Sequence, residues 1–209
     1  PMPRRDEDSH DILGTFKVLS NRAEMMKTPT SPKELFSILS HRHSILLEGR
    51  PHMNPGIFKT KNNRAGMTEF VDYQLVKGTL SQGFKYYAAL TDPFARAIFM
   101  MFMISEVHPF NDGNGRVARV MMNAEFVRAD QSRIIVPTVF REDYILALRK
   151  LTQHKDPLAY INVMTKLHQF SDNLYGTDFT ELKNYLATCN AYEEPSQAKL
   201  QIIDRTIIE

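Results

Sequence analysis

The chain has 209 residues, 43% of them hydrophobic and 24% charged, and its 26 basic and 24 acidic residues leave a formal net charge of +2. This composition is that of a globular protein, and the near balance of charge argues against nucleic acid or an anionic membrane as the main partner. The single cysteine, Cys189, excludes an internal disulfide and is typical of a reducing compartment, so we expect a soluble, cytoplasmic protein.

The first part of the chain predicts two helices. One is expected over residues 9–27, before a stretch that contains two prolines. The second is expected to begin at Ser31, because a serine followed by Pro32 and Glu34 combines an N-cap, a first-turn proline and a capping-box acid. It is expected to end at Gly49, since glycine favours the position just after a helix.

Residues 50–72 have a different pattern, which favours a small flap. Two short strands, Ile57–Lys59 and residues 68–71, are expected on either side of the turn-rich stretch 62–66.

The rest of the chain is predicted to be helical. The helix over 92–107 is apolar on nearly all sides, which places it in the middle of the fold. Its longest apolar run, Ala97–Ile104, is much shorter than the roughly 20 residues of a membrane span. A short extended piece is expected at 134–136, and further helices at 79–90, 115–128, 141–153, 157–175 and 179–187. The predicted class is therefore all-α.

One segment, between the helices 92–107 and 115–128, combines the residue types of a nucleotide site. Gly113 and Gly115 permit positive φ and a close approach of a ligand. Asn114 is a favoured N-cap for the helix that follows. The first-turn N–H groups of that helix have no internal acceptors and carry partial positive charge, so they favour an anion.

The charged side chains of this segment extend the same interpretation. Arg116 and Arg119 are three residues apart and share one face of the first turn, where guanidinium groups suit a polyphosphate. Asp112 supplies a carboxylate of the kind that holds Mg²⁺ together with substrate phosphates. His108 can accept a proton from an attacking hydroxyl. Taken singly, each of these residues also has an ordinary structural role; together they favour transfer chemistry on a nucleotide.

The sequence from His108 to Arg119, HPFNDGNGRVAR, resembles the signature of the Fic (filamentation induced by cAMP) family, His-x-Phe-x-(Asp or Glu)-Gly-Asn-Gly-Arg-x-x-Arg. Every fixed position is filled. The apolar helix before the motif and the upstream flap are also similar, so the resemblance covers roughly residues 32–170. Lys59 departs from the arginine of many relatives. The resemblance implies a Fic-type helical bundle with a β-hairpin flap.

A protein adenylyltransferase is the activity that this resemblance implies. His108 is then the general base for a Ser, Thr or Tyr hydroxyl of a target protein, which attacks the α-phosphorus of ATP and releases pyrophosphate. Asp112 is expected to hold Mg²⁺. Phe110 is expected to pack inward and fix the loop.

The same resemblance assigns the nucleotide contacts. Gly113, Asn114 and Gly115 are expected to form the anion hole. Arg116 is expected to meet the β-phosphate region and Arg119 the γ-phosphate.

Further expectations concern the target and its control. The flap, with Met67 and Thr68, resembles a target-docking hairpin that pairs with an incoming peptide. Ser44 and Glu48 formally match an inhibitory motif, Ser or Thr, three residues, Glu, then Gly or Asn, whose glutamate pairs with the second motif arginine. Two alternatives remain open: the chain lacks an inhibitor, or another protein supplies it.

The resemblance also implies boundaries and partners. Residues 1–30 are expected to be an N-terminal helical extension, 31–175 the Fic core domain, and 176–209 a C-terminal helical extension and tail. We expect a protein substrate with an exposed hydroxyl, self-modification and a homodimer as candidate partnerships, and neither nucleic acid nor membrane. Transfer of UMP, phosphocholine or phosphate, removal of AMP, and a catalytically vestigial nucleotide-binding module remain alternatives.

Overall fold

The computed structural model describes residues 6–66 and 68–205, and most of them are helical. The expected all-α class is confirmed, because the described residues form strand only in one two-stranded antiparallel sheet. The chain divides into two compact units, Pro1–Gln131 and Ser132–Glu209. No helix within the described residues is both long and apolar enough to cross a membrane.

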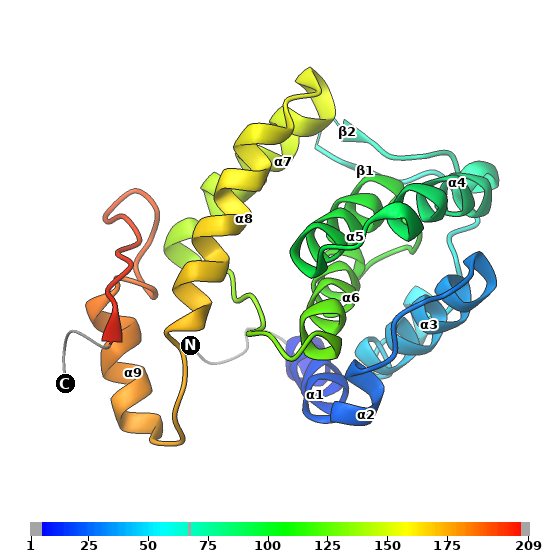
Figure 1. Ribbon diagram of the computed structural model, residues 1–209. Coiled ribbons are helices and arrows are strands. Elements are labelled where there is room, and N and C mark those ends of the chain that lie inside the picture. Colours follow the sequence, from blue (N-terminus) through cyan, green and yellow to red (C-terminus); the bar gives the residue numbers. More distant parts are fainter. Residues whose placement is uncertain (1–5, 67, 206–209) are drawn as a thin grey trace. The chain divides into compact units, whose positions relative to one another are not determined.

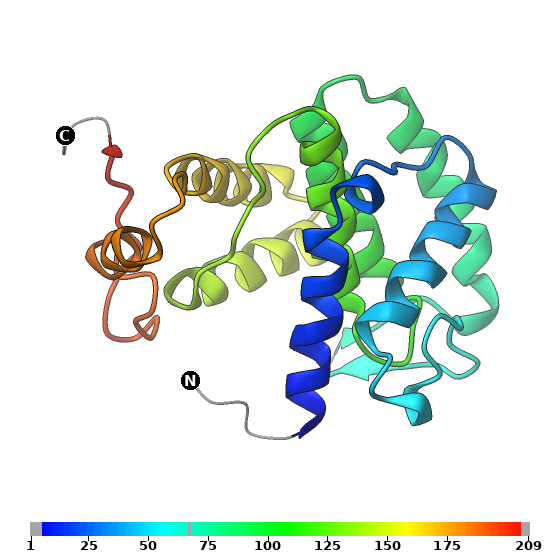
Figure 2. The same cartoon turned by 90° about the horizontal axis from the view of Figure 1, so that it is seen from below.

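The N-terminal unit is built around two adjacent helices. Figure 1 shows α5 and α6 side by side, with α4 next to α5 and α3 next to α6. In the perpendicular view of Figure 2, α1 runs beside α3 and α6. The helices of this unit are α1 (Asp6–Ser20), α2 (Arg22–Met25), α3 (Pro32–Leu46), α4 (Val76–Ala89), α5 (Pro93–Val107) and α6 (Asn114–Arg128), with short 3-10 turns η1 (Pro51–Met53) and η2 (Tyr73–Leu75).

The core of this unit consists mainly of α5 and α6. The apolar sequence of α5 does place it centrally, as expected, with most of its aliphatic and methionine side chains buried. Most of α6 is buried as well, including Glu125. The Glu125 carboxylate accepts hydrogen bonds from Tyr87 Oη at 2.6 Å and Arg96 Nε at 3.1 Å, so its burial is compensated.

The first helical stretch differs from the prediction at its end. Residues 9–27 form two helices instead of one, because the Asn21 side chain accepts a hydrogen bond from Glu24 N at 3.0 Å and starts α2. The predicted start of α3 is confirmed, since Ser31 Oγ accepts from Glu34 N at 3.2 Å. The predicted end is wrong, because α3 stops at Leu46 and the chain turns before Gly49.

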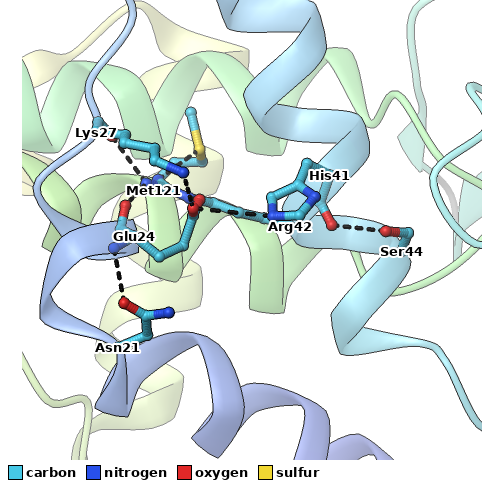
Figure 3. A network of polar contacts seen from close by, with 7 residues as sticks. All are labelled: Asn21, Glu24, Lys27, His41, Arg42, Ser44 and Met121. Carbon is cyan, nitrogen blue, oxygen red and sulfur yellow. Dashed lines mark hydrogen bonds and ion pairs between the residues drawn. The ribbon is translucent and has the colours of Figure 1, made fainter.

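A buried ion pair joins α2 to α3, as Figure 3 shows. Arg42 is fully buried and donates from Nε to Glu24 Oε1 at 3.2 Å. Its Nη2 donates to the carbonyl oxygens of Glu24 and Lys27 at 2.7 and 2.8 Å. Burial alone raises the pKa of Glu24, but Lys27 and Arg42 bring it below its usual value. This network fixes the chain between α2 and α3.

The flap is shorter and lies further along the chain than predicted. β1 (Arg64–Ala65) pairs antiparallel with β2 (Thr68–Glu69). The predicted strand Ile57–Lys59 is wrong, and the backbone there has another role. Lys59 N donates to the carbonyl oxygen of Pro109 at 2.8 Å, so this segment supports the loop after α5 instead of a sheet.

The C-terminal unit contains a helical hairpin followed by one more helix. Its elements are η3 (Thr138–Phe140), α7 (Arg141–His154), α8 (Pro157–Asp172) and α9 (Phe179–Thr188), and Figure 1 shows α7 beside α8. Residues 134–136 are not a strand. Cys189 is buried in a small cluster with Phe170, Tyr185 and Ala191, which attaches the end of the chain to α8 and α9.

Candidate active site

The predicted general base lies at the junction of α5 and the motif loop. His108 is the C-cap of α5, with its N–H donating to Ile104 O at 3.0 Å and a positive φ of 49°. A positive φ is uncommon in a residue with a side chain, although asparagine, aspartate and histidine tolerate it better than most. This conformation turns the chain sharply out of the helix and into residues 109–113.

The hydrogen bonding of His108 defines which ring nitrogen is able to accept a proton. Nδ1 lies 3.1 Å from the carbonyl oxygen of Ser105, and a carbonyl only accepts, so Nδ1 carries the hydrogen in the neutral ring. Nε2 is then the basic nitrogen. The ring stacks on Phe70 of the flap, with centroids 3.6 Å apart and planes 4° apart. Burial, followed by the charge of Lys59, lowers the pKa of His108, which favours the neutral form.

Removing the Phe70 ring is expected to change the pH at which His108 loses its proton. Phe70→Ala uncovers the imidazole, so the pKa of His108 rises toward its ordinary value of about 6.5. For a general base the neutral ring is the active form, so the acid limb of a rate profile that depends on His108 is expected to move to higher pH. Rates measured from pH 5 to 8 test this, with Phe70→Tyr, which keeps the stack, as the control. An unmoved limb in Phe70→Ala would show that the stack does not set the protonation of His108.

Asn114 holds the motif loop closed from inside. Its buried amide accepts from Phe110 N at 2.9 Å and donates to Phe110 O at 2.8 Å. The expected N-cap role of Asn114 is wrong, because Gly113 is the N-cap of α6 and Asn114 is its first residue. The amide turns inward and satisfies two buried backbone groups of the loop, of which Phe110 O also accepts from Asn63.

His43, which the sequence pattern did not single out, supports the loop from α3. It stacks on Phe110, with centroids 3.7 Å and planes 4° apart. Nε2 lies 2.9 Å from Asp112 O, and Nδ1 accepts from Gly56 N at 2.8 Å. Burial lowers the pKa of His43 to about 4, so the ring is neutral at pH 7. Phe110 is fully buried, as the sequence predicted.

Gly113 is needed for both its backbone angle and its lack of a side chain. Its φ is +73°, and a Cβ would lie 3.1 Å from Leu47 Cδ1 and 3.3 Å from His43 Nε2. Gly113→Ala is expected to destabilise the N-terminal unit, with the left-handed angle alone costing about 1–2 kcal/mol. The control is Gly78→Ala in α4, where a Cβ meets nothing within 4 Å and helix propensity predicts a gain of about 0.5–1 kcal/mol. Urea unfolding of both variants measures the difference; equal effects would contradict the close packing at Gly113.

Asp112 is partly exposed and suited to a cation that a nucleotide brings with it. Its Oδ1 accepts from Gly113 N at 2.7 Å, and Oδ2 accepts from Arg50 Nη2 at 2.6 Å. The described residues contain no cluster of three or more His, Cys, Asp and Glu side chains for a metal. A magnesium ion is often held by one or two carboxylates plus phosphates, so a single acid with free lone pairs fits that donor set.

The start of α6 has the features of an anion site. The N–H groups of Asn114 and Gly115 have no acceptor among the described residues, and they lie at the positive end of the helix. Arg119 reaches back over this turn, since its Nη1 lies 3.5 Å from the position of a Cβ on Gly115. The Arg116 guanidinium ion-pairs with Asp11 of α1 and lies 3.6 Å from Asp112. The structure thus brings the predicted residues 108 and 112–119 together at one junction.

Two further charged residues at this junction were missed from the sequence. Asp11 was assigned to an extension, and Arg50 follows the predicted end of a helix. Arg50 Nη2 lies 3.1 Å from Asp11 Oδ2 and also contacts Asp112. The burial of Asp11 and Arg50 depends on how α1 packs, and no local motif predicts that packing.

The flap is attached to the motif loop by a second amide. Asn63 Nδ2 donates to Phe110 O at 2.9 Å, and Asn63 Oδ1 accepts from Lys59 Nζ at 2.7 Å. Thr68 is half-buried in β2, whereas Met67 lies outside the described residues.

The two candidate inhibitory residues lie near the end of α3 and in the turn that follows it. Glu48 lies in the turn after α3 and forms an exposed ion pair of 2.6 Å with Lys17 of α1. Ser44 Oγ donates to the carbonyl oxygen of His41 at 2.7 Å. An inhibitory role for Ser44 and Glu48 stays a prediction.

Comparison with known sequences points to one family. Residues 35–125 match the model of the Fic/DOC family. Protein adenylyltransferase fic-1 of Caenorhabditis elegans is 39% identical over 110 residues, which are 52% of this chain and 22% of that protein. A probable protein adenylyltransferase of Aquifex aeolicus is 32% identical over 103 residues, or 49% of this chain and 30% of the relative. The chain thus matches less than a third of the length of these relatives.

Solved structures support the fold. Fic-1 (residues 134–508) of Caenorhabditis elegans has a TM-score of 0.67 at 18% identity, covering 91% of this chain and 55% of that one. BepC of Bartonella tribocorum, solved with bound AMPPNP, has a TM-score of 0.57 at 14% identity, covering 78% and 87%. Residues 35–125, which contain the complete motif at the junction of α5 and α6, thus match the Fic/DOC family, and the solved structures show a Fic-type fold.

Proposed function

We propose that this chain is a protein adenylyltransferase that transfers AMP from ATP to a Ser, Thr or Tyr hydroxyl of a target protein. The observation that carries the proposal is that one short segment, residues 108–119, contains an imidazole with a lowered pKa and a helix N-terminus with two arginines. His108 Nε2 accepts a proton, because Nδ1 donates to Ser105 O. The start of α6 with Arg116 and Arg119 receives phosphates.

Each motif residue has a distinct part in this reaction. His108 takes the proton of the target hydroxyl as its oxygen bonds to the α-phosphorus and pyrophosphate leaves. Gly113, Asn114 and Gly115 form the anion hole, where the N–H groups of Asn114 and Gly115 bind phosphate oxygens, with Arg116 at the β-phosphate and Arg119 at the γ-phosphate. Asp112 holds Mg²⁺, which when bound neutralises phosphate charge.

The relatives favour AMP as the transferred group. The curated relatives in the nematode and in Aquifex aeolicus carry the name protein adenylyltransferase, and BepC was solved with an ATP analogue. Because the chain matches only part of those relatives, the activity, the target and the nucleotide are inferences for this protein.

The flap is the proposed docking site for the target. The β1–β2 sheet has two strands, so each strand leaves one edge of backbone N–H and C=O groups unpaired within the described sheet. An extended peptide is able to add to such an edge through main-chain hydrogen bonds, independently of its sequence. Thr68 of β2 and Met67 beside it are proposed flap contacts. The flap is attached through Asn63 and Phe70 to the motif loop and His108, which brings a docked hydroxyl toward the base.

Mass spectrometry tests which group is transferred. The chain is incubated with ATP, Mg²⁺ and a cell lysate, and modified peptides, including those of the chain itself, are identified. A mass gain equal to AMP on a hydroxyl residue supports the proposal. A gain equal to UMP, phosphocholine or phosphate would replace it with another transfer, and ATP binding without any modification would leave a nucleotide-binding module.

A further inference from the structure

A closed ring of ion pairs lies next to the start of α6, where phosphate binding is proposed. It consists of Asp11, Arg50, Asp112 and Arg116, and we call it the ion-pair ring. Each carboxylate faces both guanidiniums. Asp112 Oδ2 lies 2.6 Å from Arg50 Nη2 and 3.6 Å from Arg116 Nη2. Asp11 Oδ2 lies 3.1 Å from Arg50 Nη2 and ion-pairs with Arg116 Nη1.

Close helix packing holds Asp11 in this ring. A Cβ on Gly14 of α1 would lie 2.4 Å from the carbonyl oxygen of Ile45, and a Cβ on Gly49 would lie 2.4 Å from His10 Cβ. Only glycine at both positions lets α1 approach the end of α3 this closely. Asp11 lies within one helical turn of Gly14. The close approach of α1 therefore brings Asp11 against the start of α6.

The members of the ring differ in exposure. The Asp11 and Arg50 side chains are 8% and 11% exposed, whereas those of Arg116 and Asp112 are 23% and 41% exposed. Arg116 and Asp11 also line an open pocket of about 440 Å³ between α1 and α6. The two less exposed charges therefore contact Arg116 and Asp112, the two members that a nucleotide and its cation reach most readily.

The burial of Asp11 and Arg50 carries a cost in stability. Asp11 Oδ1 and Arg50 Nε are buried without a hydrogen-bond partner in the described structure. Unpaired buried polar atoms destabilise a fold, and apolar residues of similar size often fill such positions as well or better. Two buried charges at this place have a function if they orient the Arg116 guanidinium and the Asp112 carboxylate.

We propose that Asp11 and Arg50 are positioning residues, with Asp11 orienting the Arg116 guanidinium and Arg50 orienting the Asp112 carboxylate for the nucleotide. This inference rests on the proposed function. It makes α1 part of the site, although α1 lies outside the region 35–125 that matches the family. The competing interpretation is that Asp11 neutralises Arg116 and weakens phosphate binding. The two interpretations predict opposite signs for the same substitution.

Asp11→Asn separates the two interpretations, because it removes the charge and keeps the size. With the full chain and Mg²⁺, the dissociation constant for ATP is expected to rise about tenfold, the effect of misplacing one charged donor. The control is Asp130→Asn, which removes an exposed carboxylate paired with Arg22 in the same unit and is expected to leave ATP affinity within about twofold. Unchanged or tighter ATP binding in Asp11→Asn would overturn the proposal.

A double-mutant cycle tests whether Asp11 acts through Arg116. Asp11→Asn combined with Arg116→Gln is expected to bind ATP no more weakly than Arg116→Gln alone, because the group to be oriented is already gone. Additive losses would mean that Asp11 acts elsewhere and would contradict the proposal.

Two further controls keep the ATP-binding results of the Asp11 variants interpretable. If Asp11→Asn loses its helical circular dichroism, Arg50→Lys is tested in its place. This substitution keeps the positive charge and removes the planar guanidinium group, and it is expected to weaken ATP binding. Wild-type chain that binds ATP and transfers nothing would contradict the proposed function and leave the cycle interpretable. Wild-type chain that binds no ATP would overturn both.

Discussion

Replacing His108 by alanine is expected to slow AMP transfer by about 10²–10⁴-fold, the usual contribution of a general base. The basic nitrogen is Nε2, since Nδ1 is committed to Ser105 O, and no other histidine is predicted to belong to the motif. ATP affinity is expected to stay nearly unchanged, because the proposed phosphate contacts come from residues 113–119. Initial rates of labelled AMP incorporation, together with ATP titrations, measure the two effects separately.

His41→Ala is the matched control for this substitution. His41 lies in the same unit on α3, is largely exposed and contacts Glu24 at 3.8 Å, so its loss is expected to leave the transfer rate within about twofold. A His108→Ala variant with the wild-type transfer rate would show that His108 is not the general base. A parallel loss of ATP binding would mean that the imidazole serves the nucleotide instead of the hydroxyl.

Replacing Arg42 by methionine is expected to give the largest loss of stability. The substitution leaves the Glu24 carboxylate buried, with Lys27 and a distant His41 as its remaining ionic partners, and it removes the donor for two carbonyl oxygens. Breaking a buried pair from one side costs about 3–5 kcal/mol. Urea unfolding followed by far-UV circular dichroism measures the loss in the free energy of unfolding.

An exposed ion pair of the same chemistry supplies the comparison. Arg22 and Asp130 lie 3.0 Å apart with side chains 72% and 87% exposed, so Arg22→Met is expected to cost about 0–1 kcal/mol. Equal losses in the two arginine variants would show that the Figure 3 network contributes no more than a surface pair.

The parts of the fold that follow from local signals were predictable from the sequence. The Ser31 cap predicted the start of α3, and the apolar pattern of residues 92–107 predicted the central position of α5. Both signals act within a few residues, so they can be recognised in the sequence. The flap was misplaced because the β-prone segment Ile57–Lys59 does not pair as a strand. Lys59 N donates to Pro109 O in the motif loop, and Ile57 N donates to Asn54 O. Strand propensity does not reveal such a long-range partner.

The same distinction holds for the site. The motif contains His108 and Asp112 within a few residues, so sequence alone indicated them. Arg50 contacts Asp112, and Asp11 of α1 contacts Arg50 and Arg116, so these contacts depend on the packing of α1 against α3. His43 of α3 reaches the carbonyl oxygen of Asp112, a contact that also depends on the fold. The pKa of His108 also depended on the fold, because the covering Phe70 comes from the flap.

The central claim is that the α-phosphoryl group of ATP, with its adenosine, passes to a protein hydroxyl at His108. The most direct measurement compares ATP labelled at the α-phosphate with ATP labelled at the γ-phosphate, each incubated with Mg²⁺, lysate and either wild-type chain or His108→Ala. The account predicts protein-bound label from α-labelled ATP with the wild type only. Label from γ-labelled ATP, or equal α-label with His108→Ala, would contradict it.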